Sequence, residues 1–116
     1  AGSSDPNGNT TGTETYYRTS SGKPYSDRVN AKLSTLFKDR GSKKDTRGLY
    51  WLKNTKCPAI LIEVCFVDDK DDSRIYLNNI QYCLNLFLAF VWMFLSHAYN
   101  PSSFIVGYLL VPNLFK

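Results

Sequence analysis

The chain has 116 residues and a mass of 13.2 kDa, with 14 Lys and Arg, 10 Asp and Glu, and three Cys. This length allows one compact domain, and the 43% apolar, 21% charged composition excludes a wholly disordered chain, a collagen-like chain and a disulfide-dense mini-protein. Charge is distributed unevenly, because Lys116 is the only charged residue after position 81. We therefore divide the chain into residues 1–81 and an apolar tail, residues 82–116.

The start of the sequence, its net charge and its cysteines limit the class of protein further. It opens on Ala1 without a signal-peptide pattern, which indicates a piece of a longer protein. The net charge of +4 is spread along the chain and partly paired, which argues against nucleic-acid binding. The cysteines are odd in number and lack Cys-x-x-Cys spacing, so we expect buried reduced thiols at Cys57, Cys65 and Cys83.

The first half of the chain predicts a strand, a helix and a basic loop. Residues 13–18 are rich in β-branched and aromatic side chains, which favours a strand. Residues 24–38 predict an amphipathic helix that ends before Gly41, with an inward stripe of Tyr25, Val29, Leu33, Leu36 and Phe37. Residues 40–48 form a basic loop, which is either a solvated connection or a contact for an anionic polymer.

The second half predicts two strands and a helix. Residues 49–52 are a short apolar segment that we interpret as a strand. Residues 58–67 (PAILIEVCFV) have the pattern of a strand covered on both faces near the centre of an α/β sheet. The acidic residues 68–72 suit the positive end of a following helix over 73–81, with Ile75, Ile80 and either Tyr76 or Leu77 facing inward. This order of elements favours an α/β fold.

Glu63 is the residue that most requires a chemical explanation. A carboxylate inside an apolar strand is costly to bury unless a cation, a hydrogen bond or a raised pKa compensates it. A buried salt bridge to a Lys or Arg of the chain is the structural interpretation. The functional interpretation is a general acid/base, or a carboxylate close to a metal, near the carboxyl end of a sheet strand.

Several segments together resemble a known family of enzymes. They are Gly12-Thr13-Glu14, Arg40-Gly41-Ser42-Lys43, residues 49–52 and, most specifically, Cys57-Pro58-Ala59-Ile60-Leu61-Ile62-Glu63-Val64-Cys65-Phe66-Val67-Asp68. Residues 1–81 look like the C-terminal part of the catalytic domain of a zinc-dependent N-acetylmuramoyl-L-alanine amidase of type 3, the family of bacterial autolysins and phage endolysins. The resemblance implies a twisted, mostly parallel α/β sheet flanked by helices, here without its N-terminal part.

The resemblance also implies an activity and roles for two residues. The enzyme hydrolyses the amide bond between N-acetylmuramic acid and L-alanine in peptidoglycan, which places it outside the cell or in the cell wall. Glu63 matches the glutamate that assists the zinc-bound water, and Glu14 matches a Gly-x-Glu element that we assign to substrate binding, with a structural role as the alternative. The family's zinc ligands, His, Glu and His, would all precede Ala1, so we expect no metal ligand in this chain and weak or absent activity from it alone.

The apolar tail allows three interpretations. Residues 82–99 are a membrane segment at the lower length limit, a helix packed on the sheet and partly exposed, or a non-homologous end without a selected function. His97 lies in no recognised ligand spacing, and we do not expect it to bind metal. Besides the enzyme, two further functions remain open: a non-catalytic peptidoglycan-binding module that uses the basic loop with Tyr16, Tyr17, Tyr50 or Trp51, and a small membrane-associated protein.

Overall fold

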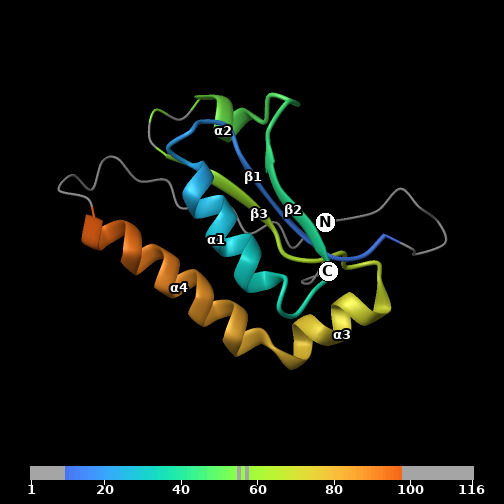
Figure 1. The fold of residues 1–116 in the computed structure, drawn as a ribbon. Coiled ribbons are helices and arrows are strands. Elements are labelled where there is room, and N and C mark those ends of the chain that lie inside the picture. Colours follow the sequence, from blue (N-terminus) through green and yellow to red (C-terminus); the bar gives the residue numbers. More distant parts are fainter. Residues whose placement is uncertain (1–9, 55, 57, 98–116) are drawn as a thin grey trace.

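The computed structural model describes residues 10–54, 56 and 58–97, and the side-chain surroundings of these residues up to 88. Three strands and four helices follow one another along the described chain (Figure 1). In order they are β1 (Thr13–Tyr17), α1 (Lys23–Leu33), β2 (Asp39–Lys44), α2 (Tyr50–Asn54), β3 (Ile60–Glu63), α3 (Lys70–Asn78) and α4 (Ile80–His97).

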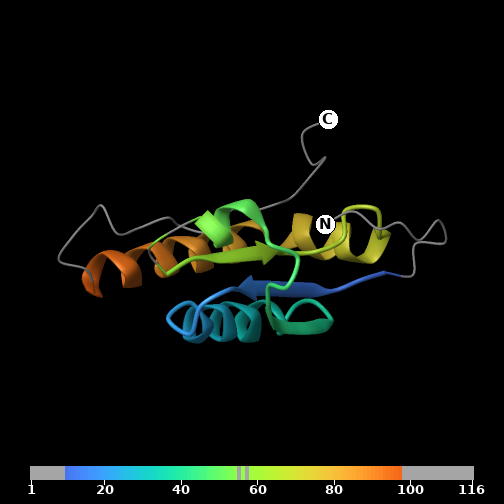
Figure 2. The same ribbon diagram turned by 90° about the horizontal axis from the view of Figure 1, so that it is seen from above.

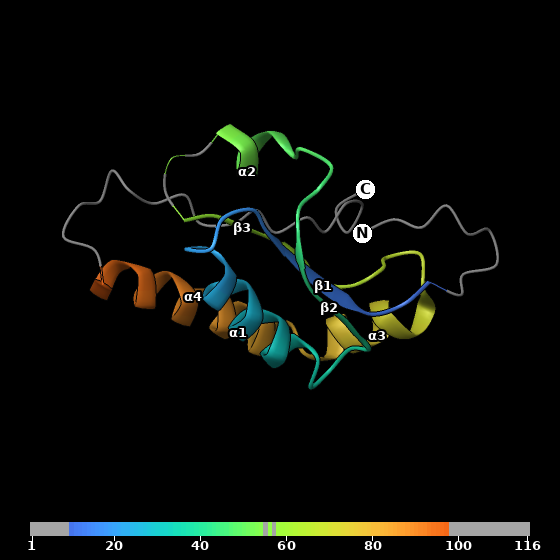
Figure 3. The ribbon, with the colours of Figure 1, turned by 45° about the horizontal axis from the view of Figure 1, so that its top comes forward.

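The strands form one mixed sheet in the order β2-β1-β3. β1 runs parallel to β2 and antiparallel to β3. Figure 3 shows α2 on one side of the strands and α1 and α4 on the other, and Figure 2 shows α1 and α2 separated by the strands. The predicted α/β fold, a sheet flanked by helices, is therefore confirmed. The strands described here include one parallel and one antiparallel pair instead of a mostly parallel set.

The main core lies between the sheet and α1, α3 and α4. The predicted inward stripe faces it: Val29 and Leu33 of α1 and Phe37 beyond its end are buried, and Tyr25 and Leu36 pack against the core. α1 ends at Leu33, earlier than the predicted end at residue 38. Further buried members come from β3 and from the segments after it, namely Ile60, Ile62, Val64, Cys65, Tyr76 and Cys83. Cys65 and Cys83 are thus buried thiols, as expected, whereas Cys57 lies outside the described residues.

A smaller apolar cluster lies on the opposite face of the sheet. Leu52 of α2 packs there with Ala59 and Leu61, and Tyr16 is partly buried against them. Because side chains alternate along a strand, Leu61 and Glu63 share this face, while Ile60 and Ile62 point to the main core. We call it the α2 face.

The position predicted for the apolar strand was wrong in one respect. β3 lies at an edge of the described sheet, and β1 is its middle strand. β3 still has the sequence of a doubly covered strand, because α1 and α4 pack on one of its faces and α2 packs on the other. An unbroken apolar run indicates that other elements pack on both faces of a strand. It does not indicate that the strand has a neighbouring strand at both edges.

The basic segment predicted as a loop over residues 40–48 contains a strand instead. β2 is polar throughout, but it pairs in parallel with β1 from Thr13 to Tyr17. Pairing with a distant strand therefore overrides the low strand propensity of the sequence DRGSKK.

The apolar segment predicted as a strand over residues 49–52 is mostly helical, because α2 begins at Tyr50. The buried Asp45 carboxylate accepts hydrogen bonds from the backbone N–H groups of Arg47 (3.0 Å) and Leu49 (2.9 Å), which closes a turn just before α2. Four apolar residues are too few for their spacing to distinguish the two structures.

The predicted helix after the acidic run is confirmed and begins earlier, at Lys70. Asp69 caps it, because its side chain accepts a hydrogen bond from the Asp72 backbone N–H at 2.8 Å. Of the predicted inward set, Tyr76 is buried and Ile75 packs partly buried against the main core, whereas Leu77 (56% exposed) and Ile80 (38% exposed) face solvent, so the prediction for Ile80 was wrong.

α4 carries the first part of the predicted apolar tail. Cys83 is fully buried, and Leu86 and Phe87 pack against the main core. Within the described residues, no helix combines the length and apolar character required to cross a bilayer. The surroundings of the His97 side chain, and everything predicted for residues 98–116, lie outside what the structure describes. The division of the chain at residue 81 stays a prediction.

Candidate catalytic carboxyl pair

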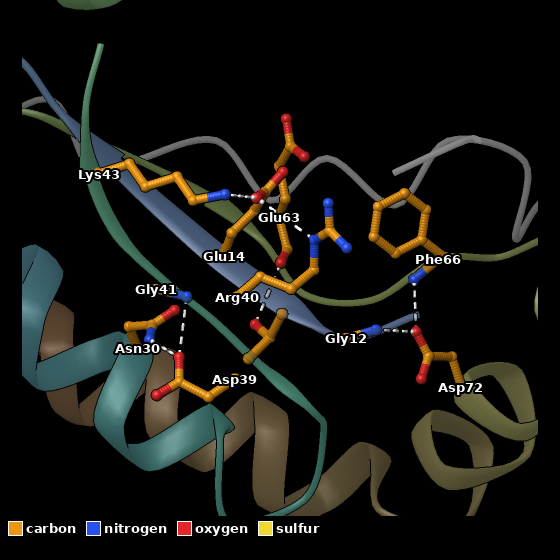
Figure 4. A network of polar contacts seen from close by, with 11 residues as sticks. Gly12, Glu14, Asn30, Asp39, Arg40, Gly41, Lys43, Glu63, Phe66 and Asp72 are labelled. Atoms are coloured by element: carbon orange, nitrogen blue, oxygen red, sulfur yellow. Dashed lines mark hydrogen bonds and ion pairs between the residues drawn. The ribbon is translucent and has the colours of Figure 1, made fainter. Parts of the chain in front are cut away.

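The structure brings the two glutamates singled out in the sequence together. Glu14 of β1 and Glu63 of β3 are direct partners across the antiparallel pair, so both side chains lie on the α2 face. The Thr13 hydroxyl donates a hydrogen bond to the Glu63 carbonyl oxygen (3.1 Å), which ties the two strands together at this point. Figure 4 shows the two carboxyl groups side by side.

Glu14 is buried and held by two cations of β2. Lys43 Nζ lies 2.6 Å and Arg40 Nε 3.4 Å from the same Glu14 oxygen (Figure 4). Burial by itself raises the pKa of Glu14, but the hydrogen bonds with Lys43 and Glu63 and the charge of Lys43 lower it more. The pKa of Glu14 therefore lies below its ordinary value, and this carboxylate is ionised at neutral pH.

Glu63 has the opposite electrostatic environment. Burial raises its pKa, and the hydrogen bond with Glu14 and the negative charge of Glu14 raise it further. Within the described part of the chain, no Lys or Arg forms an ion pair with Glu63. The buried salt bridge considered as the structural interpretation thus involves Glu14, not Glu63. The pair consequently favours a proton on Glu63 beside an ionised Glu14.

The surroundings of the pair combine aromatic rings and cations. The Arg47 guanidinium lies 4.4 Å from the centre of the Tyr16 ring, and that of Arg40 lies 5.0 Å from the centre of the Phe66 ring. Burial and then the charge of Glu14 raise the pKa of Tyr16 to about 12, so its phenol is neutral near pH 7.

Four aromatic residues were candidates for cell-wall contact in the binding-module alternative, and the structure separates them. Tyr16 lies beside the carboxyl pair, whereas Tyr17 packs against the main core on the opposite face. Tyr50 and Trp51 are 69% and 49% exposed on α2, with their rings edge to face at 5.5 Å.

Asp72 is a buried residue of this region whose role sequence reasoning missed. Its carboxylate accepts hydrogen bonds from the Thr11 hydroxyl (2.6 Å) and from the backbone N–H groups of Gly12 (2.8 Å) and Phe66 (2.9 Å). It thereby links α3 to the segments beside Glu14 and Glu63 (Figure 4). The acidic run after β3 was the available signal, but it was interpreted only through the helix dipole.

The described residues do not form a metal site. Nowhere among them do three or more His, Cys, Asp and Glu side chains gather in a way that could hold a metal ion. The carboxyl pair itself can take up and release a proton.

The raised pKa of Glu63 leads to a prediction about stability. Because the pKa of Glu63 is raised in the fold, protonated Glu63 is more favourable to the folded state than ionised Glu63. This contribution to stability is fully present below the ordinary pKa of 4.5 and is lost as the pH rises through the pKa of the folded state. Glu63→Gln resembles the protonated form, so we expect it to raise the free energy of unfolding at pH 7 by about 0.5 kcal/mol. Urea unfolding checks this, and the gain should shrink near pH 4. A less stable variant at pH 7 would contradict it.

Comparison with known proteins places this chain in a family. The sequence profile of the N-acetylmuramoyl-L-alanine amidase family Amidase_3 matches residues 2–83. An uncharacterised protein of Clostridium perfringens is 43% identical over 68 residues, which are 57% of this chain and 20% of that protein. The N-acetylmuramoyl-L-alanine amidase LytC of Bacillus subtilis is 33% identical over 73 residues, 61% of this chain and 14% of LytC. The chain thus spans a fifth or less of these relatives.

Solved structures agree with this assignment. The catalytic domain of the CD27L endolysin targeting Clostridium difficile superposes with a TM-score of 0.60 and 36% identity, over 68% of this chain and 48% of that one. The catalytic domain of CwlV, an N-acetylmuramoyl-L-alanine amidase from Bacillus (Paenibacillus) polymyxa, shares the fold, with a TM-score of 0.66 and 21% identity over 84% of this chain and 55% of its own. This chain belongs to the Amidase_3 family of N-acetylmuramoyl-L-alanine amidases.

Proposed function

We propose that this chain is part of a peptidoglycan hydrolase that cleaves the amide bond between N-acetylmuramic acid and the L-alanine of the stem peptide. Membership of the Amidase_3 family supports the reaction class. The observation that carries the proposal is Glu63, a half-buried carboxyl group at the end of β3 with a raised pKa and no cationic partner among the described residues.

Amide hydrolysis needs a group that moves a proton twice. A base takes a proton from the attacking water, and the same group then gives it to the nitrogen of the leaving L-alanine, because an unprotonated amine anion is a very poor leaving group. A carboxyl group does both steps best when its pKa lies near the working pH. Glu63 is moved in this direction by burial and by Glu14, and we assign the proton transfer to it.

Zinc dependence is general in this family, but the described residues do not fit a zinc site by themselves. We therefore infer that the ligands of a zinc ion in the complete protein come from outside these residues, and we assign no step of the reaction to a metal held by them. Glu63 and its neighbours supply acid/base chemistry.

The place of action follows from the substrate. We propose that the complete protein works on peptidoglycan outside the cell or in the cell wall, like an autolysin or an endolysin. Contact of residues 82–116 with a membrane remains a separate proposal, and most of that segment lies outside the described residues.

The proposed reaction is tested by identifying the new chain ends in digested peptidoglycan. The complete protein that contains this chain is incubated with purified cell walls. Amidase activity releases free amino groups on L-alanine without any new reducing sugar ends. Reducing ends would instead indicate a glycosidase, and unchanged cell walls would count against any hydrolase.

A non-catalytic binding module is the second candidate. It is favoured by the exposed pair Tyr50 and Trp51, which follows Arg47 closely in the sequence; aromatic rings can stack on sugars, and a guanidinium can contact an anionic polymer. A pull-down with insoluble peptidoglycan separates the candidates. Binding without new chain ends supports the module, whereas binding that survives Glu63→Gln while hydrolysis is lost supports the enzyme.

A further inference from the structure

We propose that Glu14 is a positioning residue for Glu63: β2 is bulged so that Lys43 and Arg40 keep Glu14 ionised, and the ionised Glu14 holds the reaction's proton on Glu63. This inference deepens the proposed function and rests on it. It assigns to Glu14 a role in the proton chemistry of its neighbour, in place of the substrate contact expected from the sequence.

The bulge in β2 explains how two cations reach one carboxylate. Thr13 pairs with Asp39 and Thr15 with Ser42, so the single residue between them on β1 faces two residues on β2, Arg40 and Gly41. Gly41 has φ of +100°, a conformation that glycine adopts readily. The chain can therefore bulge here without steric strain.

The consequence is a change in the alternation of side chains along β2. In a regular strand, residues three apart point to opposite faces. Here Arg40 and Lys43 both contact Glu14. Asp39 and Ser42 point instead towards α1, where the Asn30 amide donates to Asp39 Oδ1 at 2.8 Å and the Ser26 and Ser42 hydroxyls lie 2.7 Å apart. Because of the extra residue, the side chains of Arg40 and Lys43 both lie on the α2 face.

The two cations act on Glu14 and not on Glu63. Two carboxylates directly opposite each other repel, and such a pair is stabilised when one of them keeps a proton and donates it to the other. Because Lys43 and Arg40 both contact Glu14, Glu14 is the member that stays ionised. A proton that the pair takes up, such as the one from the attacking water, therefore goes to Glu63, the member assigned to the reaction.

Other groups near Glu63 do not change which of the two glutamates takes the proton. On β1, Tyr16 is neutral near pH 7 because its pKa is about 12. After β2, the Arg47 charge lowers the pKa of Glu63, but less than burial and Glu14 raise it. Arg47 is itself drawn towards Asp45, with Nε 3.9 Å from the carboxylate. Glu14 is thus the main charged group that retains the proton on Glu63.

Carbon-13 NMR titration of the glutamate carboxyl groups tests this inference in the chain itself, without any need for activity. In the unmodified chain Glu63 should titrate above the ordinary glutamate value and Glu14 below it. Glu14→Gln should move the midpoint of Glu63 to lower pH, and Glu14→Asp should keep it raised. Lys43→Gln should move the midpoint of Glu14 to higher pH.

Lys44→Gln is the matched control, because it removes the same charge from the next, exposed residue of β2. It should leave both midpoints in place. An unchanged Glu63 midpoint in a Glu14→Gln chain with a native amide spectrum overturns the inference. If that variant does not fold, an unchanged Glu14 midpoint in Lys43→Gln overturns it instead. Peptidoglycan cleavage is measured in a separate experiment. If that reaction is not observed, the titrations still decide whether Glu14 raises the pKa of Glu63.

Discussion

Replacing Asp72 by Ala is expected to lower the free energy of unfolding by about 3 kcal/mol. The carboxylate is buried and accepts hydrogen bonds from two backbone N–H groups, those of Gly12 and Phe66, and from the Thr11 hydroxyl. Hydrogen bonds to a charged group contribute about 1.5–3 kcal/mol each, and buried donors left without an acceptor add their desolvation cost. Partial entry of water limits the total, so the three losses do not simply add.

Asp71→Ala is the matched control for this substitution. Asp71 precedes Asp72 in the same first turn of α3, but its carboxylate is 75% exposed and forms an ion pair with the exposed Arg74 at 3.0 Å. Removal of an exposed pair of this kind costs about 0.5 kcal/mol or less. Urea unfolding of both variants measures the difference. Equal losses would show that Asp72 acts through helix propensity or the dipole and does not hold the strands.

The contacts of Asp72 also connect stability to the candidate site. Gly12 lies two residues before Glu14, and Phe66 lies three residues after Glu63. One carboxylate therefore fastens the segments that flank both members of the carboxyl pair. We expect the Asp72→Ala chain to disturb the pair even where it remains folded.

The elements predicted well from the sequence are those in which the spacing of apolar side chains directly reflects which faces of the element are buried. α1 shows its buried stripe directly as helical spacing, and β3 shows its cover on both faces as an apolar run. Glu63 was identified because it interrupts that run. Its resemblance to a family glutamate agreed with this physical argument, which rests on the cost of burying a charge.

The elements predicted badly are those fixed by distant partners. β2 has the composition of a solvated loop, and only its pairing with β1 makes it a strand. The role of Lys43 and Arg40 depends on a bulge that no local pattern reveals, although Gly41 is consistent with it. Similarly, the environment of Glu63 depends on register: a shift of one residue between β1 and β3 would move Glu14 to the other face.

Glu63→Gln in the complete protein is expected to lower kcat for peptidoglycan hydrolysis by about 10² to 10⁴, the range typical for loss of a general acid/base. Gln preserves the size of the side chain and its hydrogen bond to Glu14, but it cannot accept a proton from water at neutral pH. The affinity for peptidoglycan should change little, because the missing group acts mainly in the transition state. Release of L-alanine amino groups from cell walls measures kcat, and a pull-down measures binding.

Asp71→Asn makes the same chemical change at an exposed position of α3 and should keep full activity. The decisive comparison sets activity against stability. If Glu63 is a reacting group placed where its charge is unfavourable, the Gln variant should lose activity while it gains stability near pH 7, as is common for catalytic residues. A variant that loses both would assign Glu63 to the framework of the sheet. One that keeps its activity would leave the proton transfer to another residue of the complete protein.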